Sequence, residues 1–426
     1  MDLLEFLDKS PVNFLAVDTI KHELLANGFT QIDAIQALPD LKPGGQYFVT
    51  KNDSSIYAFR LGKKSMWEAG FHLICAHCDS PTFRIKPQSV MRGEGGLVRL
   101  NVEVYGGPIL STWMDRPLSL AGRVIVKGKD ALHPDTRLLF VRRPLLVIPN
   151  LAIHFNRQVN DGVKLSKQKD MLPILGIIKE GLEGNVLTNL ISSELSIKEE
   201  DILDFDLYLY DATPACTCGI NQEFISSGRL DDLSMVHAGL SALLKANKKP
   251  EVTQVLAIFD NEETGSQTKQ GAGSPFLGNM LQRIILKQGG TQDDYYRAVE
   301  QAFMVSADNA HAFHPNYAEK YDPTNHPHMG EGPVIKINAA QKYATDAASA
   351  SAFAEICRQA GVPCQYFVNH SDVAGGSTLG NILTSSLPVK GVDMGNPIWA
   401  MHSCRETASV ADHEFCISAF TEFYNI

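Results

Sequence analysis

Histidine and carboxylate side chains stand directly after several strand-like runs of this sequence. His77 follows the apolar run 71–75 with Asp79 two residues later, and Asp308 and His402 follow further apolar runs. In open α/β sheets, sites form beyond the carboxyl ends of the strands, so we expect these side chains to gather there. A His-x-Asp pair lets His77 bind a metal ion while Asp79 orients the imidazole or a neighbouring lysine, although such a pair alone is often structural.

Two pairs of adjacent acids add to this pattern. Asp231 and Asp232 open a predicted helix, where carboxylates stabilise the positive end of the helix dipole; the alternative is a carboxylate that bridges two metal ions. Glu262 and Glu263 follow the predicted strand 252–259. Their charges repel unless a cation or water separates them. This stretch is therefore either an acidic surface loop or a metal ligand beside a general base, the combination that hydrolysis requires.

Together these histidines and carboxylates form the nitrogen and oxygen ligand set of a two-zinc or related hydrolytic centre. The eight cysteines suggest a different zinc site. Cys75 and Cys78 enclose His77 in a CxxC motif, but Cys216 and Cys218 lack the two-residue gap of a zinc ribbon. Reduced, mostly buried thiols explain these cysteines better, because they are too sparse for a disulfide scaffold.

The elements that must position these residues alternate between strands and helices in the first and last parts of the chain. Strands are predicted over residues 46–49, 56–59, 71–75, 252–259, 302–306, 334–337 and 365–368. Helices are predicted over residues 14–25, 233–244, 274–287, 345–360 and 413–423. This alternation predicts a largely parallel sheet with helices on both faces.

The middle of the chain has a different texture. Short strand-like runs cover residues 97–105, 118–126, 138–148 and 205–210, and a polar stretch over residues 156–170 is a predicted exposed loop. We therefore predict an α/β catalytic domain made of residues 1–91 and 228–426. A mainly β domain, residues 92–227, is inserted into it.

Composition excludes several classes of protein. The 426 residues carry 38 Lys and Arg against 48 Asp and Glu, a net charge of −10, which argues against a nucleic-acid binder. No apolar run reaches the roughly 20 residues of a membrane helix. The N-terminus has acids where a signal peptide needs basic residues. We expect a soluble, cytoplasmic protein with no nucleic-acid or membrane partner.

Eight segments of the chain resemble the motifs of a known family. They run from about residue 76 to 407 and read AHCDSPTFRIKP, VEVYGGPILSTWMDRPLSLAGRV, NLAIHFNR, SSGRLDDL, FDNEETGS, SADNAHAFHPNY, NAAQKYATDA and MHSCRE. These motifs are long and specific, and they stand in the family's order. The sequence resembles the M18 metallopeptidases, the aspartyl aminopeptidase family.

The resemblance implies a three-layer α/β/α zinc-exopeptidase fold and two zinc ions per subunit, although Co²⁺ or Mn²⁺ also suits such ligands. It assigns one metal ion to His77 and Asp308, the other to Glu263 and His402, and the bridge between them to Asp231. The family pattern makes Glu262 the general base and Asp79 the partner of His77.

The resemblance also implies self-association. The inserted domain would be a dimerisation domain, and the dimers would build a tetrahedral dodecamer. His154, which lies in the inserted domain, would reach the active site of a neighbouring subunit. The implied substrates are peptides with a free N-terminus.

Several residues have two interpretations. His311 and His314 shape the substrate pocket or form structural hydrogen bonds. Lys342 offers the cation that an acidic first residue needs, but some acid-preferring relatives carry a basic residue two positions earlier, where this chain has Ala340. Both acidic and neutral first residues therefore stay open. His326 and His328 are either a metal-ligand pair or part of a rigid loop, and the neighbouring prolines favour the loop. His370 and Asp372 are candidate pocket residues, and residues 375–378 either approach the substrate or cap a helix.

Two other functions compete with an aminopeptidase. A dizinc carboxypeptidase or deacylase of similar architecture would use the same ligands but would not require a free amine. A non-catalytic assembly protein could keep the fold, although it would not need Glu262 beside Glu263.

Overall fold

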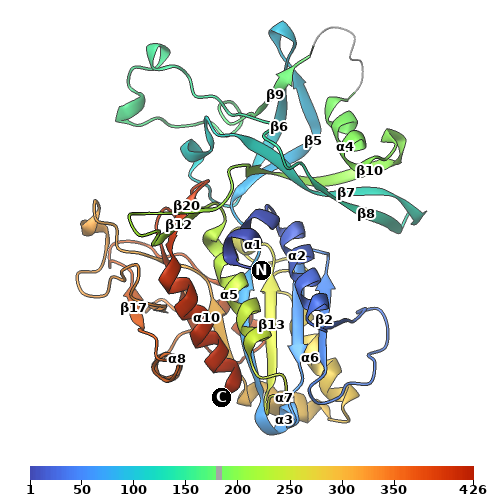
Figure 1. The fold of residues 1–426 in the computed structure, drawn as a ribbon, viewed down its shortest axis with the longest axis vertical. Coiled ribbons are helices and arrows are strands. Elements are labelled where there is room, and N and C mark those ends of the chain that lie inside the picture. Colours follow the sequence, from blue (N-terminus) through green and yellow to red (C-terminus); the bar gives the residue numbers. More distant parts are fainter. Residues whose placement is uncertain (179–184) are drawn as a thin grey trace. The chain divides into compact units, whose positions relative to one another are not determined.

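The computed structural model describes residues 1–178 and 185–426 and divides them into two compact units (Figure 1). The first unit contains residues 1–79, 215–401 and 406–426, and the second contains residues 80–214 and 402–405.

A nine-stranded mixed sheet forms the centre of the first unit. Its strands, in spatial order, are β1 (Thr30–Gln31), β2 (Gln46–Lys51), β3 (Ser55–Arg60), β13 (Thr253–Phe259), β4 (Phe71–His77), β14 (Phe303–Ala307), β18 (Lys390–Gly395), β16 (Val334–Ile337) and β17 (Gln365–Val368). Strands β13, β4, β14 and β18 are mutually parallel. Their carboxyl ends therefore meet at one edge, where an α/β fold builds its sites.

Helices cover both faces of this sheet, as the sequence predicts. One face packs against α1 (Leu3–Lys9), α2 (Asn13–Ala26), α5 (Leu230–Lys245), α8 (Ala347–Ala360) and α10 (Val410–Asn425). The other packs against α3 (Met66–Ala69), α6 (Phe276–Lys287), α7 (Gln292–Gln301) and α9 (Leu379–Ser386). Figure 1 shows α5 and α10 side by side. The three-layer α/β/α class is thus confirmed.

The apolar strands explain these layers. Every residue of β13 is buried, and alternate side chains along it enter the two different hydrophobic clusters. Leu256 and Ile258 pack on the α5 side, whereas Val255 and Phe259 pack on the α6 side. A strand with helices on both faces needs apolar residues at every position, because successive side chains point in opposite directions.

Two small sheets complete the first unit. One joins β11 (Cys216–Cys218), β12 (Phe224–Ser227) and β20 (Glu406–Ser409), and the other pairs β15 (Ala310–His311) with β19 (Pro397–Ile398).

A six-stranded antiparallel sheet forms the second unit. Its strands are β8 (His133–Phe140), β7 (Leu118–Asp130), β10 (Ile202–Asp211), β5 (Thr82–Arg92), β6 (Leu97–Tyr105) and β9 (Ile174–Ile177), and α4 (Val186–Leu195) packs on it. Gly122 of β7 has φ +152°, and a Cβ there would lie 2.0 Å from the carbonyl oxygen of Asp206. The close approach of β7 to β10 therefore requires glycine at this position.

The predicted strand 138–148 is wrong over its second half. β8 ends at Phe140, and only isolated bridges follow at Leu146 and Val147. Pro144 lies between Phe140 and Leu146 and has no N–H to donate to a neighbouring strand.

The second unit begins at residue 80 and includes residues 402–405, whereas the inserted domain was expected to span residues 92–227. β5 already belongs to the six-stranded sheet, and β11 and β12 pair with β20 of the first unit. Within the described residues, no helix combines the length and the hydrophobicity needed to cross a bilayer.

Candidate metal centre

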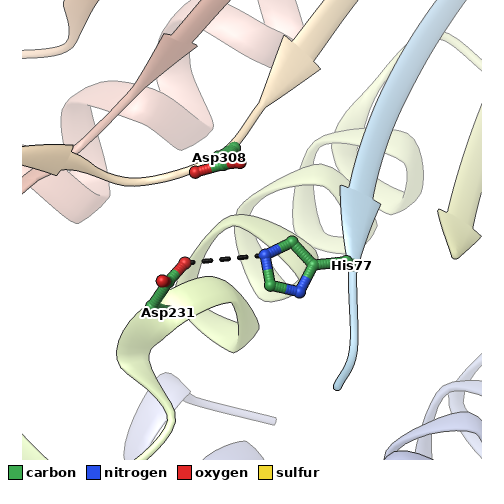
Figure 2. Close-up of side chains that lie close together, drawn as sticks. All are labelled: His77, Asp231 and Asp308. Carbon is green, nitrogen blue, oxygen red and sulfur yellow. Dashed lines mark ion pairs between the residues drawn. The ribbon is translucent and has the colours of Figure 1, made fainter. Parts of the chain in front are cut away.

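His77 is the last residue of β4, and only 1% of it is exposed. Its main-chain N–H donates to Asp232 Oδ2 (3.1 Å), and its Nδ1 lies 3.0 Å from the carbonyl oxygen of Asp79. A neutral imidazole that donates from Nδ1 to a carbonyl oxygen keeps a lone pair on Nε2. This Nε2 lies 3.6 Å from Asp231 Oδ1 (Figure 2). The strand end thus presents a ring nitrogen of the kind that binds metal ions.

Asp231 and Asp232 lie at the start of α5, but neither caps it. The helix has no side-chain capping hydrogen bond, and both acids have non-helical backbone angles. The N–H of Asp231 donates to Glu406 Oε2 (3.0 Å), and the Asp232 carboxylate accepts from the His77 N–H and from Asn309 Nδ2 (3.4 Å). Helix capping therefore does not account for this pair. Asp232 braces the end of β4, while the carboxylate of Asp231 faces the His77 ring.

Asp79 connects the histidine to the glutamate loop. Its Oδ1 accepts from the N–H of Glu262 and its Oδ2 from the N–H of Glu263, both at 3.1 Å. Its Oδ1 also lies 3.4 Å from His77 Nδ1. Asn261 begins the loop in the left-handed conformation (φ 60°) and gives it a tight turn after β13. One buried carboxylate therefore fixes the positions of both glutamates and the histidine.

Asp308 lies one residue beyond β14 and is 8% exposed. Its N–H donates to the carbonyl oxygen of Met394, which extends the pairing of β14 with β18 past the end of the strand. Its Oδ1 lies 3.1 Å from the ammonium of Lys336. The backbone and the lysine thus hold the side chain from two directions.

These residues meet at the carboxyl edge of the sheet. The ligand atoms of His77, Asp231 and Asp308 lie within 4.8 Å of one another, and so do those of His77, Glu262 and Glu263. Figure 2 shows the carboxylates of Asp231 and Asp308 on either side of the space next to the His77 ring. They come from the start of α5 and the end of β14. All five were predicted from the sequence as metal ligands or as the general base.

The electrostatics of this cluster favour a cation. Burial, and the carboxylates of Asp308, Glu263 and Asp79, raise the pKa of Glu262 to about 9. Burial also raises the pKa of Asp232 well above its ordinary value. Burial opposes a charged His77, but Asp231 and Asp79 raise the pKa of the ring well above its ordinary value. Without positive charge these buried acids must retain protons, because like charges disfavour ionisation.

A transition-metal ion fits this set of donors. Zinc accepts histidine nitrogen and carboxylate oxygen, and hydrogen bonds from neighbouring groups orient such ligands. Here hydrogen bonds hold the side chains of His77 and Asp308 and the backbone N–H groups of Asp231 and Glu262. Divalent charge would also allow the crowded carboxylates to ionise together.

Two predicted site residues belong to the second unit. His402 lies in its segment 402–405, with Nδ1 3.2 Å from the carbonyl oxygen of Gly107. His154 lies in the 3₁₀ turn Ile153–Phe155 and is exposed. The ligand role of His402 and the catalytic role of His154 stay predictions.

The predicted substrate residues lie in the first unit. Lys342 is exposed in the loop between β16 and α8. The ring of His311 faces that of Phe367 (6.0 Å between centroids), and His314 lies 4.9 Å from the ring of Tyr317. Their contact with a substrate stays a prediction. His326 and His328 pack around the ring of Phe313.

Sequence reasoning missed three buried residues that support the cluster. Asn309 donates to the carbonyl oxygen of Leu230 (2.8 Å) and so ties β14 to the start of α5. Glu406 accepts from the N–H of Asp231, and Lys336 holds Asp308. Asn309 and Glu406 lie inside recognised motifs and Lys336 lies between two of them, but only the lysine gave a signal of its own, as a charged residue inside the apolar run VIKI.

A known protein family matches nearly the whole chain. Residues 6–424 match the family model described as aminopeptidase I zinc metalloprotease (M18). A protein of Clostridium acetobutylicum named probable M18 family aminopeptidase 2 is 54% identical over 425 residues, which cover 100% of this chain and 98% of the relative. A protein of the same name from Ectopseudomonas mendocina is 42% identical, with 99% and 97% covered.

Solved structures show the same fold. A chain in the cryo-EM structure of the Ape4 and Nbr1 complex superposes with a TM-score of 0.95 at 37% identity, over 100% of this chain and 85% of that chain. The mApe1 dodecamer of S. cerevisiae gives a TM-score of 0.86 at 25% identity, over 99% of this chain and 95% of that chain.

Proposed function

The chain belongs to the aminopeptidase I zinc metalloprotease (M18) family and is a metalloaminopeptidase, and we propose that it releases N-terminal residues with two zinc ions per subunit. The observation that carries the proposal is the cluster of His77, Asp231, Asp308, Glu262 and Glu263 at the carboxyl edge of the sheet.

The proposed ligand set divides the cluster between two ions. In this proposal His77 and Asp308 would hold one ion, Glu263 and His402 would hold the other, and Asp231 would serve both. The grouping of His77 with Asp231 and Asp308 supports the first half of this assignment. The native ion is zinc in this proposal, and Co²⁺ or Mn²⁺ could replace it because both accept the same donors.

The residues of the chain divide the chemistry between them. When bound, the ions would polarise the scissile carbonyl and lower the pKa of water. Glu262 accepts the proton of the attacking water on its carboxylate and returns it to the leaving amine. Asp79 holds the loop in register for this transfer, because it accepts from the N–H groups of both Glu262 and Glu263. Positive charge next to Glu262 also lowers its pKa, so that it can act as a base near neutral pH.

The first residue of the substrate would contact Lys342, His311 and His314. An exposed lysine at residue 342 supports a preference for Asp or Glu through a charge-assisted hydrogen bond. Alanine at residue 340, where some acid-preferring relatives carry a cation, supports neutral residues instead. We propose the acidic preference as the version to test.

Self-association belongs to the proposal as well. The second unit carries a cavity of about 950 Å³ whose lining includes Leu97, Leu151 and Val163. Leu151 is 60% exposed and Phe155 is 81% exposed, so the segment around His154 presents apolar surface. Apolar patches of this kind mark protein interfaces. We propose that the second unit forms dimers, that these assemble into a dodecamer like that of mApe1, and that His154 acts in the neighbouring subunit.

A mixing experiment tests whether His154 acts in the active site of the neighbouring subunit. His154→Ala and Glu262→Gln would each abolish turnover. In a mixed dimer, one site receives intact Glu262 from its own chain and intact His154 from the other. Recovery of activity on mixing supports a site completed by His154 of the neighbouring subunit. If the mixed oligomers stay inactive, His154 acts within its own chain.

The cellular location is the last part of the proposal. None of the eight cysteines forms a disulfide, which supports a reducing compartment and a cytoplasmic location. Fractionation of cells that express the protein at its natural level tests this.

The experiment that tests the function measures release of the first residue from peptides that differ only there, after chelation and after zinc is returned. We expect no release without metal, recovery at two zinc ions per chain, and faster release of Asp and Glu. Equal rates for all first residues would remove the acidic preference. Full activity after chelation would remove the metal mechanism.

A further inference from the structure

Lys336 is a buried cation in the middle of an apolar strand. It belongs to β16, whose sequence is VIKI, and only 3% of the residue is exposed. Lysine is almost never fully buried unless a partner compensates its charge. Its partner here is Asp308 of the candidate metal centre.

The contacts of its ammonium are specific. Nζ lies 3.1 Å from Asp308 Oδ1 and 3.1 Å from the carbonyl oxygen of Asn309, so it bonds to two consecutive residues beyond β14. It also lies 5.5 Å from the centre of the Tyr343 ring. Because two acceptors and one ring surround it, the ammonium has little freedom to move away from Asp308.

The sheet topology places this lysine where it can act. β16 and β14 both pair with β18, one on each side of it. Asp393 of β18 is fully buried between them and accepts from Thr378 Oγ1 (2.7 Å) and from the N–H of Ala344 (2.6 Å). Asp393 therefore has partners of its own. The ammonium of Lys336 is directed past it to the carboxylate beyond β14.

We propose that Lys336 is a positioning residue of the metal centre, which holds one oxygen of Asp308 so that its other oxygen is presented to an ion. The proposal rests on the proposed function, because it requires Asp308 to be a metal ligand. With Oδ1 bonded to the ammonium, the carboxylate cannot rotate freely, and its geometry is set before an ion arrives.

The test compares zinc affinity in the wild type and in Lys336→Met, which keeps the length of the side chain and removes its charge. Loss of a group that orients a metal ligand typically weakens binding about 10–100-fold, and we expect that range for the weaker-bound zinc ion. kcat should fall with it, whereas KM should change less than about threefold, because Lys336 does not touch the substrate. Lys390→Met, an exposed lysine at the start of β18, is the matched control.

A double variant shows whether the effect passes through Asp308. In an Asp308→Asn background, Lys336→Met should cost no further zinc affinity, because the carboxylate that it positions is gone. The absorption spectrum of the Co²⁺-loaded protein gives a readout that does not depend on activity. We expect Lys336→Met to shift the visible bands, since one ligand is reoriented.

The possible outcomes separate the two proposals. Wild-type protein that binds no zinc would contradict the proposed function itself. Wild-type protein that binds zinc and turns over substrate, with Lys336→Met equal to it in zinc affinity and cobalt spectrum, would overturn the positioning role. If Lys336→Met does not fold, Lys336→Arg decides the matter: its planar head group moves the donor atoms, so weaker zinc binding supports positioning and unchanged binding overturns it.

Discussion

The two units of this protein differ in the kind of side chain that they bury and the kind that they expose to solvent. The first unit buries charge: His77, Asp231 and Asp308 are at most 8% exposed, at the edge where parallel strands end. The second unit exposes apolar side chains, with Leu151 60% and Phe155 81% accessible. Both arrangements oppose the stability of an isolated chain, because charge prefers water and apolar groups avoid it.

The difference indicates what each unit gains from a partner. Buried acids are compensated by a cation, so the first unit is built for metal chemistry. Exposed apolar groups are compensated by a second protein surface, which supports the proposal that the second unit takes part in assembly. Each of the following variants affects one side of this contrast and should leave the other side unchanged.

The largest effect is expected for Glu262→Gln. It removes the proposed general base while keeping the volume of the side chain, so kcat should fall about 10²–10⁴-fold. Zinc content and oligomeric mass should not change. The measurement is turnover of one peptide at saturation together with metal analysis. Wild-type kcat in the variant would show that another group accepts the proton.

The exposed apolar segment of the second unit is tested by Leu151→Asp combined with Phe155→Asp. Central apolar anchors of an interface contribute about 2–4 kcal/mol, so self-association should weaken at least 10²-fold. Sedimentation velocity measures this, and Ile220→Asp, which is 96% exposed in the first unit, is the control. An unchanged mass distribution in the double variant would place the interface elsewhere.

Acid should weaken the first unit before the second. His237 of α5 and His413 of α10 are buried against each other, with Nδ1 of the first 2.9 Å from Nε2 of the second. Burial lowers the pKa of His237 from 6.5 to about 4 and lowers that of His413 as well. The unfolded chain then binds more protons below pH 6.5. Stability from this pair is therefore lost as pH falls from 6.5 to about 4.

For His237 this loss is about 3 kcal/mol at the lower end of the range. Hydrogen exchange between pH 6.5 and 4 should show α5 and α10 losing protection before β7 and β10, and His237→Gln should reduce the pH dependence. The control is His133→Gln, because the His133 side chain of the second unit is 67% exposed. The idea fails if the two variants show the same slope.

The smallest effect is expected at the surface of the substrate pocket. Lys342→Met should lower kcat/KM for peptides that begin with Asp or Glu about tenfold and leave neutral first residues unchanged. Ala340→Lys should act in the opposite direction. Equal losses for acidic and neutral residues would show that Lys342 supports the loop and not the specificity.

The sequence was enough to locate most of the centre. His77, Asp308 and Glu262 stand at strand ends, and runs of apolar residues mark those strands. Chain order alone could not show the braces between segments, since the partner of Asp79 lies 183 residues away at Glu262. The bonds from Asn309 to the start of α5 and from Lys336 to Asp308 likewise depend on the order of strands in the sheet.

Several elements were not found from the sequence. No strand was predicted over β5, so its pairing with β6 in the six-stranded sheet was missed. The helices α1, α3, α4 and α7 were not predicted. At Phe140, proline a few residues later ended a strand that the apolar pattern continued.

The central claim is that the buried acids of the first unit hold metal ions that cleave the first residue from a free N-terminus. The most direct measurement gives zinc-loaded protein one peptide with a free amine and the same peptide with an acetylated amine. Our account predicts rapid release of the first residue from the free peptide and at least about 10³-fold slower cleavage of the acetylated one. Equal cleavage of both, or cleavage from the carboxyl end, would identify a carboxypeptidase or deacylase. No cleavage of either by protein that holds two zinc ions would contradict the account.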